Sequence, residues 1–165
     1  CSALPCGMAK VGVFVNESED FILNVSKNVG LDIIQLHGEE SDGFIESIRK
    51  NTGLPVIKKF SDKDFHNASL IERCPADIIL IDTFHENLRG GTGKAFDHKI
   101  VKDINRRRVM IAGGLNSENI IQVMTDSDVF GYDISSGGEN EKGIKDDIMI
   151  NRLFRKVREY ERQIR

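Results

Sequence analysis

The chain alternates short apolar runs with amphipathic segments from Lys10 to its end, and this alternation limits the folds open to it. Apolar runs of strand length recur about every 24 residues, a spacing typical of βα units. An amphipathic segment of helical period follows each run. Such strict alternation predicts an α/β fold with a parallel sheet. The six runs are residues 11–15, 33–37, 55–60, 78–82, 109–112 and 130–135.

Two architectures fit this pattern, an open doubly wound sheet and a closed (β/α)₈ barrel. Six strands complete an open sheet, whereas a barrel needs two further βα units. Alternation alone therefore favours the open sheet, and only the residues at the strand ends favour the barrel. In both architectures parallel strands are buried on both faces, so we expect the wholly apolar first run, residues 11–15, to be buried.

Length and composition describe a single globular unit. With 165 residues we expect one partial barrel domain over residues 1–165, with an irregular segment at residues 1–9. A net charge of −3 gives no general attraction to nucleic acid or to anionic membranes. No apolar run approaches the roughly 20 residues of a membrane helix.

The cysteines and histidines predict neither a disulfide framework nor a metal site. Three cysteines are an odd number, and their spacing is irregular, so a reducing cytoplasm is the simplest compartment. No histidines have the spacing of metal ligands, so we predict no metal. These residues are Cys1, Cys6, Cys74, His37, His66, His85 and His98.

Glycine-rich turns close the last two predicted strands. Gly113 and Gly114 follow the fifth run, and the sixth run ends in Ser135-Ser136-Gly137-Gly138. Glycine lets backbone amides approach a ligand closely, and such amides form a nest for phosphate. Barrels commonly bind phosphate after strands seven and eight. Each pair alone is compatible with an ordinary turn, but the two together favour a phosphate site.

Polar side chains also close earlier strands. Asp82 ends a run of aliphatic residues, where a carboxyl group is costly unless it is used or paired, so it is a candidate general acid. A cap for the following segment is the alternative. His37 closes the second run, and a lone histidine is more often structural than catalytic.

The segment from Arg89 to Lys94 resembles a phosphate-binding P-loop at first sight. That motif requires Ser or Thr after its Gly-Lys pair, and Ala95 stands there instead. Glycines at three of four positions still predict a mobile loop that suits a lid. The residues of this candidate lid are Gly90, Gly91, Thr92 and Gly93.

Several segments taken together resemble phosphoribosylanthranilate isomerase of tryptophan biosynthesis, in the family's order and near its spacing. They cover the chain from Lys10 to its end. They are Val11-Gly12-Val13-Phe14-Val15-Asn16, Gln35-Leu36-His37-Gly38-Glu39, Asp82 with Gly90-Gly91-Thr92-Gly93 and Phe96-Asp97, Ala112-Gly113-Gly114-Leu115-Asn116 with Glu118-Asn119, and Asp133-Ile134-Ser135-Ser136-Gly137 with Gly143-Ile144-Lys145-Asp146.

The resemblance implies an incomplete (β/α)₈ barrel that holds strands three to eight of the family and lacks the first two βα units. The implied reaction is the Amadori rearrangement of N-(5-phosphoribosyl)anthranilate to 1-(o-carboxyphenylamino)-1-deoxyribulose 5-phosphate, without cofactor or metal. By position Asp82 matches the general acid, and Asp133 matches a further active-site carboxylate. The resemblance implies that Asp133 and His37 bind substrate. The phosphate-binding positions are Gly113, Gly114, Ser135, Ser136 and Gly137.

The family's general base is a cysteine at the end of strand one, and an arginine after strand two meets the anthranilate carboxylate. Cys6-Gly7-Met8 is superficially similar to the cysteine motif, but it directly abuts the run at residue 11, so we interpret it as a coincidence. We therefore expect very low turnover by this chain alone. We also expect poor stability, dimerisation through the strand edges at residues 11–15 and 130–135, or completion by another chain.

Two further hypotheses remain open from the sequence. One is a phosphate-sugar-binding module or remnant without catalytic activity, which the missing base favours and Asp82 opposes. The other is a different phosphate-binding barrel, either a ribulose-phosphate epimerase, which needs metal ligands that the sequence does not show, or an indole-glycerol-phosphate synthase, which needs lysines on early strands.

Overall fold

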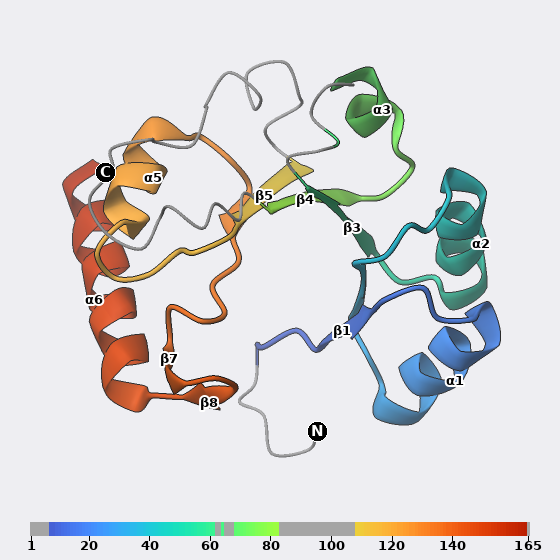
Figure 1. Cartoon of the computed structure of the whole chain (residues 1–165), viewed down its shortest axis with the longest axis horizontal. Coiled ribbons are helices and arrows are strands. Elements are labelled where there is room, and N and C mark those ends of the chain that lie inside the picture. The colour runs from blue at the N-terminus through green and yellow to red at the C-terminus, as the bar shows by residue number, and fades with distance from the viewer. Residues whose placement is uncertain (1–6, 62–63, 65–67, 83–107, 165) are drawn as a thin grey trace. The chain divides into compact units, whose positions relative to one another are not determined.

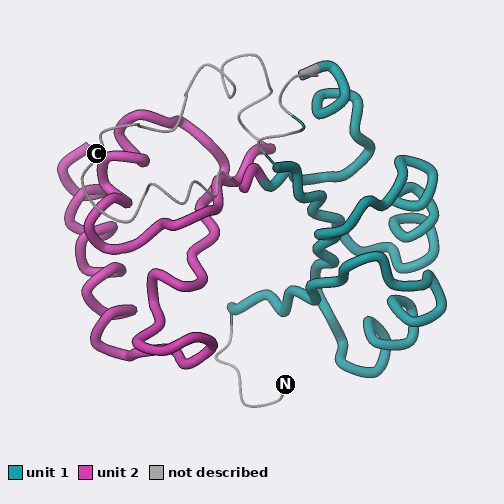
Figure 2. Tube along the Cα trace, viewed as in Figure 1, with its two compact units in different colours: residues 1–80 teal, residues 81–165 magenta. Residues whose placement is uncertain are grey.

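The computed structural model describes residues 7–61, 64, 68–82 and 108–164 as an α/β chain (Figure 1). It divides into two compact units, residues 1–80 and residues 81–165, which are described separately below (Figure 2). Among the described helices, none is long and apolar enough to cross a membrane.

Unit 1, residues 1–80, is built from consecutive βα units. Its strands lie in the order of the chain, and β1 pairs in parallel with β2, which pairs in parallel with β3. The elements are β1 (Val11–Phe14), α1 (Glu19–Val29), β2 (Ile33–Leu36), α2 (Asp42–Thr52), β3 (Val56–Ser61), α3 (Ala68–Arg73) and β4 (Ile78–Asp82), whose last two residues belong to unit 2.

Local sequence signals set the ends of α1 and α2. Ser18 and Ser41 cap their first turns, each side-chain hydroxyl accepting a backbone N–H at 3.3 Å. Gly30 and Gly53 end the helices with φ of 65° and 69°, in the left-handed region that favours glycine. Ser18 is the cap of α1.

The core of unit 1 lies between the sheet and its helices. Fully buried side chains from both layers meet there: Ile22, Ile34, Leu36, Ile45, Ile48 and Val56. The expected burial of the first strand on both faces is wrong. Phe14 packs edge-on against Phe21 of α1, but Val13, on the opposite face, is 56% exposed because no described residue covers it.

Unit 2 contains the shorter parallel pair β5 (Val109–Ala112) and β6 (Gly131–Tyr132), with Ile111 opposite Tyr132. Helices α5 (Ile120–Asp126) and α6 (Asp147–Ile164) follow the strands. The strand β6 is shorter than its predicted run, residues 130–135.

An antiparallel hairpin of β7 (Glu139–Glu141) and β8 (Ile144–Lys145) stands between β6 and α6. Periodicity does not predict this hairpin, because its strands are too short and too polar to give a pattern. Gly143, with φ of 82°, turns the chain between the two strands. The hairpin returns the chain to the turn after β6, where the predicted phosphate site lies.

Candidate functional site

The two glycine turns after β5 and β6 lie against each other, as the sequence predicts for a shared site. Gly113 and Gly114 have φ of 98° and 62°, so both occupy the left-handed region. Asn116 then forms a parallel bridge with Gly137. A Cβ on Gly137 would lie 1.9 Å from the carbonyl oxygen of Leu115, so only glycine allows this approach.

Both turns present backbone N–H groups with no acceptor among the described residues. These are the N–H groups of Gly113, Gly114, Ser135 and Ser136. The turns are fixed by hydrogen bonds to their carbonyl oxygens. The carbonyl of Gly114 accepts the side-chain amide of Asn119 at 3.0 Å, and the carbonyl of Ser135 accepts the N–H of Gly138 at 3.2 Å. Adjacent amides with no internal acceptor form a nest for an anion such as phosphate.

Two carboxylates occupy strand ends in the same unit. Asp82 is the last residue of β4 and is half-buried. Asp133 directly follows β6, is also half-buried, and donates its backbone N–H to the carbonyl of Ile111 at 2.8 Å. Unit 2 thus contains both candidate carboxylates and both candidate phosphate turns.

The hairpin β7–β8 adds a charged residue that the search for strand ends missed. Lys145 Nζ donates to the carbonyl oxygen of Ser135 at 2.8 Å and to a carboxylate oxygen of Glu139 at 2.6 Å. The hydrogen bond from Lys145 and another from Gly143 N–H hold the pKa of Glu139 below its ordinary value. The motif Gly143-Ile144-Lys145-Asp146 pointed to this residue without indicating its contacts.

His37 lies in unit 1, at the end of β2. It is half-buried, and its backbone N–H donates to the carbonyl of Phe14 at 2.8 Å. The side-chain amide nitrogen of Gln35 is in hydrogen-bond contact with Nε2 of His37. His37 is thus held at the carboxyl end of its strand, the edge where ligands bind in parallel α/β folds.

A buried ion pair beside His37 was also missed. Lys58 Nζ lies 2.7 Å from Glu40 Oε2, and the two side chains are 7% and 3% exposed. The other oxygen of Glu40 accepts the N–H groups of Asn16 and Gly38 at 2.9 and 3.1 Å. Burial raises the pKa of Glu40, but the hydrogen bonds from Lys58 and Asn16 outweigh it and lower the pKa below its ordinary value.

Most of the remaining predicted residues are not part of the described structure. The candidate lid, Gly90, Gly91, Thr92 and Gly93, lies outside the described residues, as do Cys6 and the histidines other than His37. Cys74 is buried in unit 1. Within the described ranges, no three His, Cys, Asp or Glu side chains are grouped in a way that would hold a metal ion.

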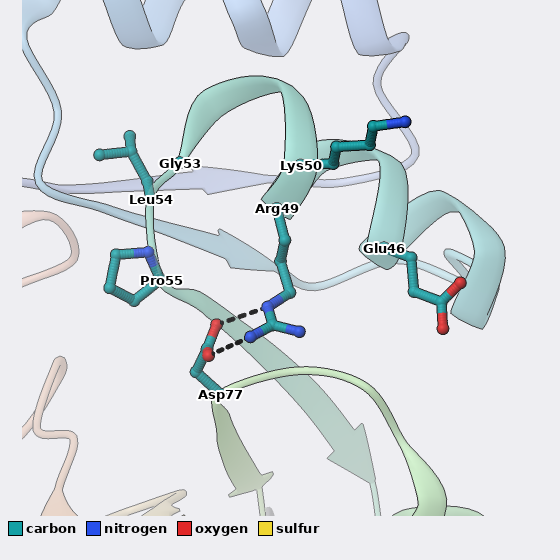
Figure 3. A pocket seen from close by; sticks show the side chains of 7 residues that line it. All are labelled: Glu46, Arg49, Lys50, Gly53, Leu54, Pro55 and Asp77. Atoms are coloured by element: carbon teal, nitrogen blue, oxygen red, sulfur yellow. Dashed lines mark hydrogen bonds and ion pairs between the residues drawn. The ribbon is translucent and has the colours of Figure 1, made fainter.

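A surface pocket lies elsewhere, in unit 1 between the end of α2 and the starts of β3 and β4 (Figure 3). Arg49 crosses it and binds both carboxylate oxygens of Asp77, at 2.9 and 2.6 Å. Asp77 also accepts the N–H of Val56 at 2.8 Å. The pocket is at the amino ends of its strands, which in barrels is the stabilising edge and not the catalytic one.

Comparison with known proteins gives a consistent result. A family model described as "N-(5'phosphoribosyl)anthranilate (PRA) isomerase" matches residues 4–156. An N-(5'-phosphoribosyl)anthranilate isomerase from Rubrobacter xylanophilus is 40% identical over 153 residues, which are 92% of this chain and 74% of the relative.

Solved structures of the same kind share the fold. Phosphoribosyl anthranilate isomerase from Thermus thermophilus has a TM-score of 0.77 at 29% identity, over 96% of this chain and 76% of its own. A phosphoribosyl anthranilate isomerase in complex with reduced 1-(o-carboxyphenylamino)-1-deoxyribulose 5-phosphate has a TM-score of 0.75 at 30% identity, over 93% and 73%. This similarity confirms the predicted fold class, α/β with part of a (β/α)₈ barrel.

Proposed function

The chain belongs to the N-(5'-phosphoribosyl)anthranilate isomerase family, and from this premise we propose that Asp82 is its general acid and that the turns after β5 and β6 bind the substrate phosphate. The family's reaction is an Amadori rearrangement in tryptophan biosynthesis. It converts N-(5-phosphoribosyl)anthranilate to 1-(o-carboxyphenylamino)-1-deoxyribulose 5-phosphate.

The reaction needs one proton donor and one proton acceptor. A general acid protonates the ring oxygen of the ribose, the C1–O bond breaks, and the nitrogen lone pair forms a Schiff base with C1. A base then removes the proton from C2, and the resulting enolamine becomes a ketone at C2 with a new C–H bond at C1. We assign the first proton to Asp82 because it is a half-buried carboxyl group at a strand end in unit 2.

The close approach of Gly137 to Leu115 is the observation that carries this proposal. It brings two turns with acceptor-free amides into contact, and such a nest suits the phosphate of the substrate. The bound product analogue in the related crystal structure is also a sugar 5-phosphate. We assign Asp133 and His37 to substrate binding, because both are held by backbone hydrogen bonds at the ends of their strands.

The test of the acid is Asp82→Asn, with Asp128→Asn as a matched control on an exposed residue of the same unit. Asp82→Asn should lower kcat by about 10²- to 10⁴-fold and leave the binding of inorganic phosphate unchanged. Asp128→Asn should retain the kcat of the unsubstituted protein. A kcat for Asp82→Asn within a few-fold of the unsubstituted protein would exclude Asp82 as the acid.

Complementation of a tryptophan auxotroph separates the isomerase from a binding module without catalytic activity. Because very low turnover is expected of this chain alone, the unsubstituted protein should restore only slow growth without tryptophan, and the Asp82→Asn variant should restore none. Growth supported equally by both would exclude the assigned acid, and growth supported by neither would favour the binding module.

We also propose that the 165-residue chain self-associates through β1. This strand is at the end of the sheet order, and among the described residues nothing pairs with its outer edge. Val13 and Val15 beside that edge are 56% and 58% exposed. Unpaired apolar edges promote association, and an edge lysine opposes it. Sedimentation should show dimers that Val13→Lys converts to monomers; a concentration-independent monomer would contradict the proposal.

A further inference from the structure

Lys145 contacts the turn of Ser135–Gly138, called the phosphate turn below, through the backbone. Its ammonium group donates to the carbonyl oxygen of Ser135 at 2.8 Å, and Glu139 holds the same group at 2.6 Å. Glu139 is itself fixed, because its second oxygen accepts Gly143 N–H at 3.0 Å. The hairpin therefore anchors one peptide group of the phosphate turn.

The next residue attaches the turn to a helix. Asp146 donates its N–H to the carbonyl of Gly138 at 2.8 Å. Its carboxylate accepts the N–H of Met149 at 2.9 Å, which caps the first turn of α6. The end of the phosphate turn is thus bound to an 18-residue helix. Its start is held by Lys145, by the Ser135 hydroxyl against Glu139 at 3.5 Å, and by turn hydrogen bonds to the carbonyls of Ser135 and Ser136.

The geometry of the peptide group links the contact of Lys145 with the Ser135 carbonyl to the direction of the Ser136 N–H. In a trans peptide the C=O and N–H bonds point to opposite sides of the chain, and the structure has no cis peptide among its described residues. Fixing the carbonyl of Ser135 toward Lys145 therefore directs the N–H of Ser136 away from it. That N–H is one of the four without a described acceptor. A cation on the carbonyl oxygen also polarises the N–H, which strengthens it as a donor.

An ordinary surface ion pair does not explain this arrangement. Exposed Lys–Glu pairs contribute little, and Lys145 is 49% exposed. The contact that distinguishes Lys145 is its bond to the carbonyl of Ser135, while Lys142 in the same hairpin lies on the surface.

We propose that Lys145 is a positioning residue of the phosphate site, which fixes and polarises the Ser135–Ser136 peptide so that the Ser136 N–H donates to the phosphate group of the substrate. The inference rests on the phosphate site assigned above. It assigns a role to the motif Gly143-Ile144-Lys145-Asp146. Lys145 contacts the phosphate turn, Gly143 donates to its partner Glu139, and Asp146 caps the following helix.

The first experiment compares Lys145→Met with Lys142→Met, which removes the same charge from the same hairpin. Binding of inorganic phosphate is measured by calorimetry and by the shift of the Ser136 amide in NMR spectra, and turnover is measured with the phosphoribosyl substrate. Lys145→Met should weaken phosphate binding and raise KM by about tenfold, with kcat within twofold. Lys142→Met should change neither, and Lys145→Arg should restore most of the affinity.

Glu139→Gln distinguishes positioning from a simple field effect. It removes a negative charge near the phosphate turn, so a field effect alone would strengthen phosphate binding. Positioning predicts the opposite, a loss of roughly threefold, because Lys145 then lacks the carboxylate that holds it. Thermal melts of all variants confirm that the fold is retained.

The outcomes separate this inference from the proposed function. If the unsubstituted protein binds phosphate with a shift of the Ser136 amide, but Lys145→Met binds equally well, the role of Lys145 is excluded and the phosphate site stands. Stronger binding by Glu139→Gln also excludes positioning. If phosphate does not shift the Ser136 amide of the unsubstituted protein, the phosphate site itself is excluded, and the role of Lys145 with it.

Discussion

The buried pair of Glu40 and Lys58 makes the sharpest prediction about stability. The two side chains are 3% and 7% exposed, so neither charge is solvated if its partner is removed. Breaking such a pair typically costs about 3–5 kcal/mol. In Lys58→Met the carboxylate retains two backbone donors, at 2.9 and 3.1 Å, so we expect the lower end, about 3 kcal/mol. In a chain of this length that lowers Tm by about 6–12 °C.

The matched control is Glu39→Gln, beside the pair but exposed. Urea unfolding followed by circular dichroism should show a loss of about 3 kcal/mol for Glu40→Gln and less than ~0.5 kcal/mol for Glu39→Gln. The double variant of Glu40→Gln with Lys58→Met should be more stable than the sum of the single losses predicts, by at least ~1.5 kcal/mol, because no unpaired charge remains.

The pH dependence of stability gives an independent test of the role of Glu40. The pKa of Glu40 is lower in the folded chain than its ordinary value of 4.5, so the carboxylate stabilises the fold fully above pH 4.5. That contribution is lost as the pH falls below 4.5 and through the folded pKa. Glu40→Gln should therefore lose less stability on acidification than the unsubstituted chain. Equal losses, or equal stability of the Glu39 and Glu40 variants, would refute the argument.

Three further predictions follow from contacts in the structure. Gly137→Ala places a Cβ 1.9 Å from a backbone oxygen, so it should destabilise the chain and weaken phosphate binding, whereas Gly43→Ala meets nothing within 4 Å and should leave stability equal or higher by up to ~1 kcal/mol. Ser26 is buried and its hydroxyl has no hydrogen-bond partner among the described residues, so Ser26→Ala should leave the unfolding midpoint equal or raise it; a clear loss would contradict this. Asp77→Ala removes acceptors for a guanidinium and a backbone N–H and should cost about 1–3 kcal/mol, more than Arg49→Met in the same denaturation assay; the reverse order would contradict it.

Much of the fold was predictable because its signals are local. Alternation of apolar runs and amphipathic segments predicts the strands and helices, and Ser41 and Gly53 mark the ends of α2 within a residue. The hairpin β7–β8 was not predictable in this way, because strands of three and two residues are too short to show a periodicity.

The residues of the candidate site were likewise predictable only where their signals are local. The sequence alone indicated Asp82 and the glycine turns, because polar and glycine residues that directly follow apolar runs stand out in one dimension. It did not indicate Glu40 with Lys58, which are 18 positions apart, nor the carbonyl of Ser135 as the partner of Lys145. Charged residues are common in this chain, so their identity does not reveal which are paired.

The order of residues by itself determined the α/β class, the repeat and the positions of glycine, since each depends on neighbours along the chain. Only the tertiary structure decided that Gly137 packs on the carbonyl of Leu115 and that Lys145 donates to the carbonyl of Ser135. Both contacts join segments whose separation is set by how strands and turns close in space, and the free energy of such a contact depends on distance and direction, which the linear sequence does not specify.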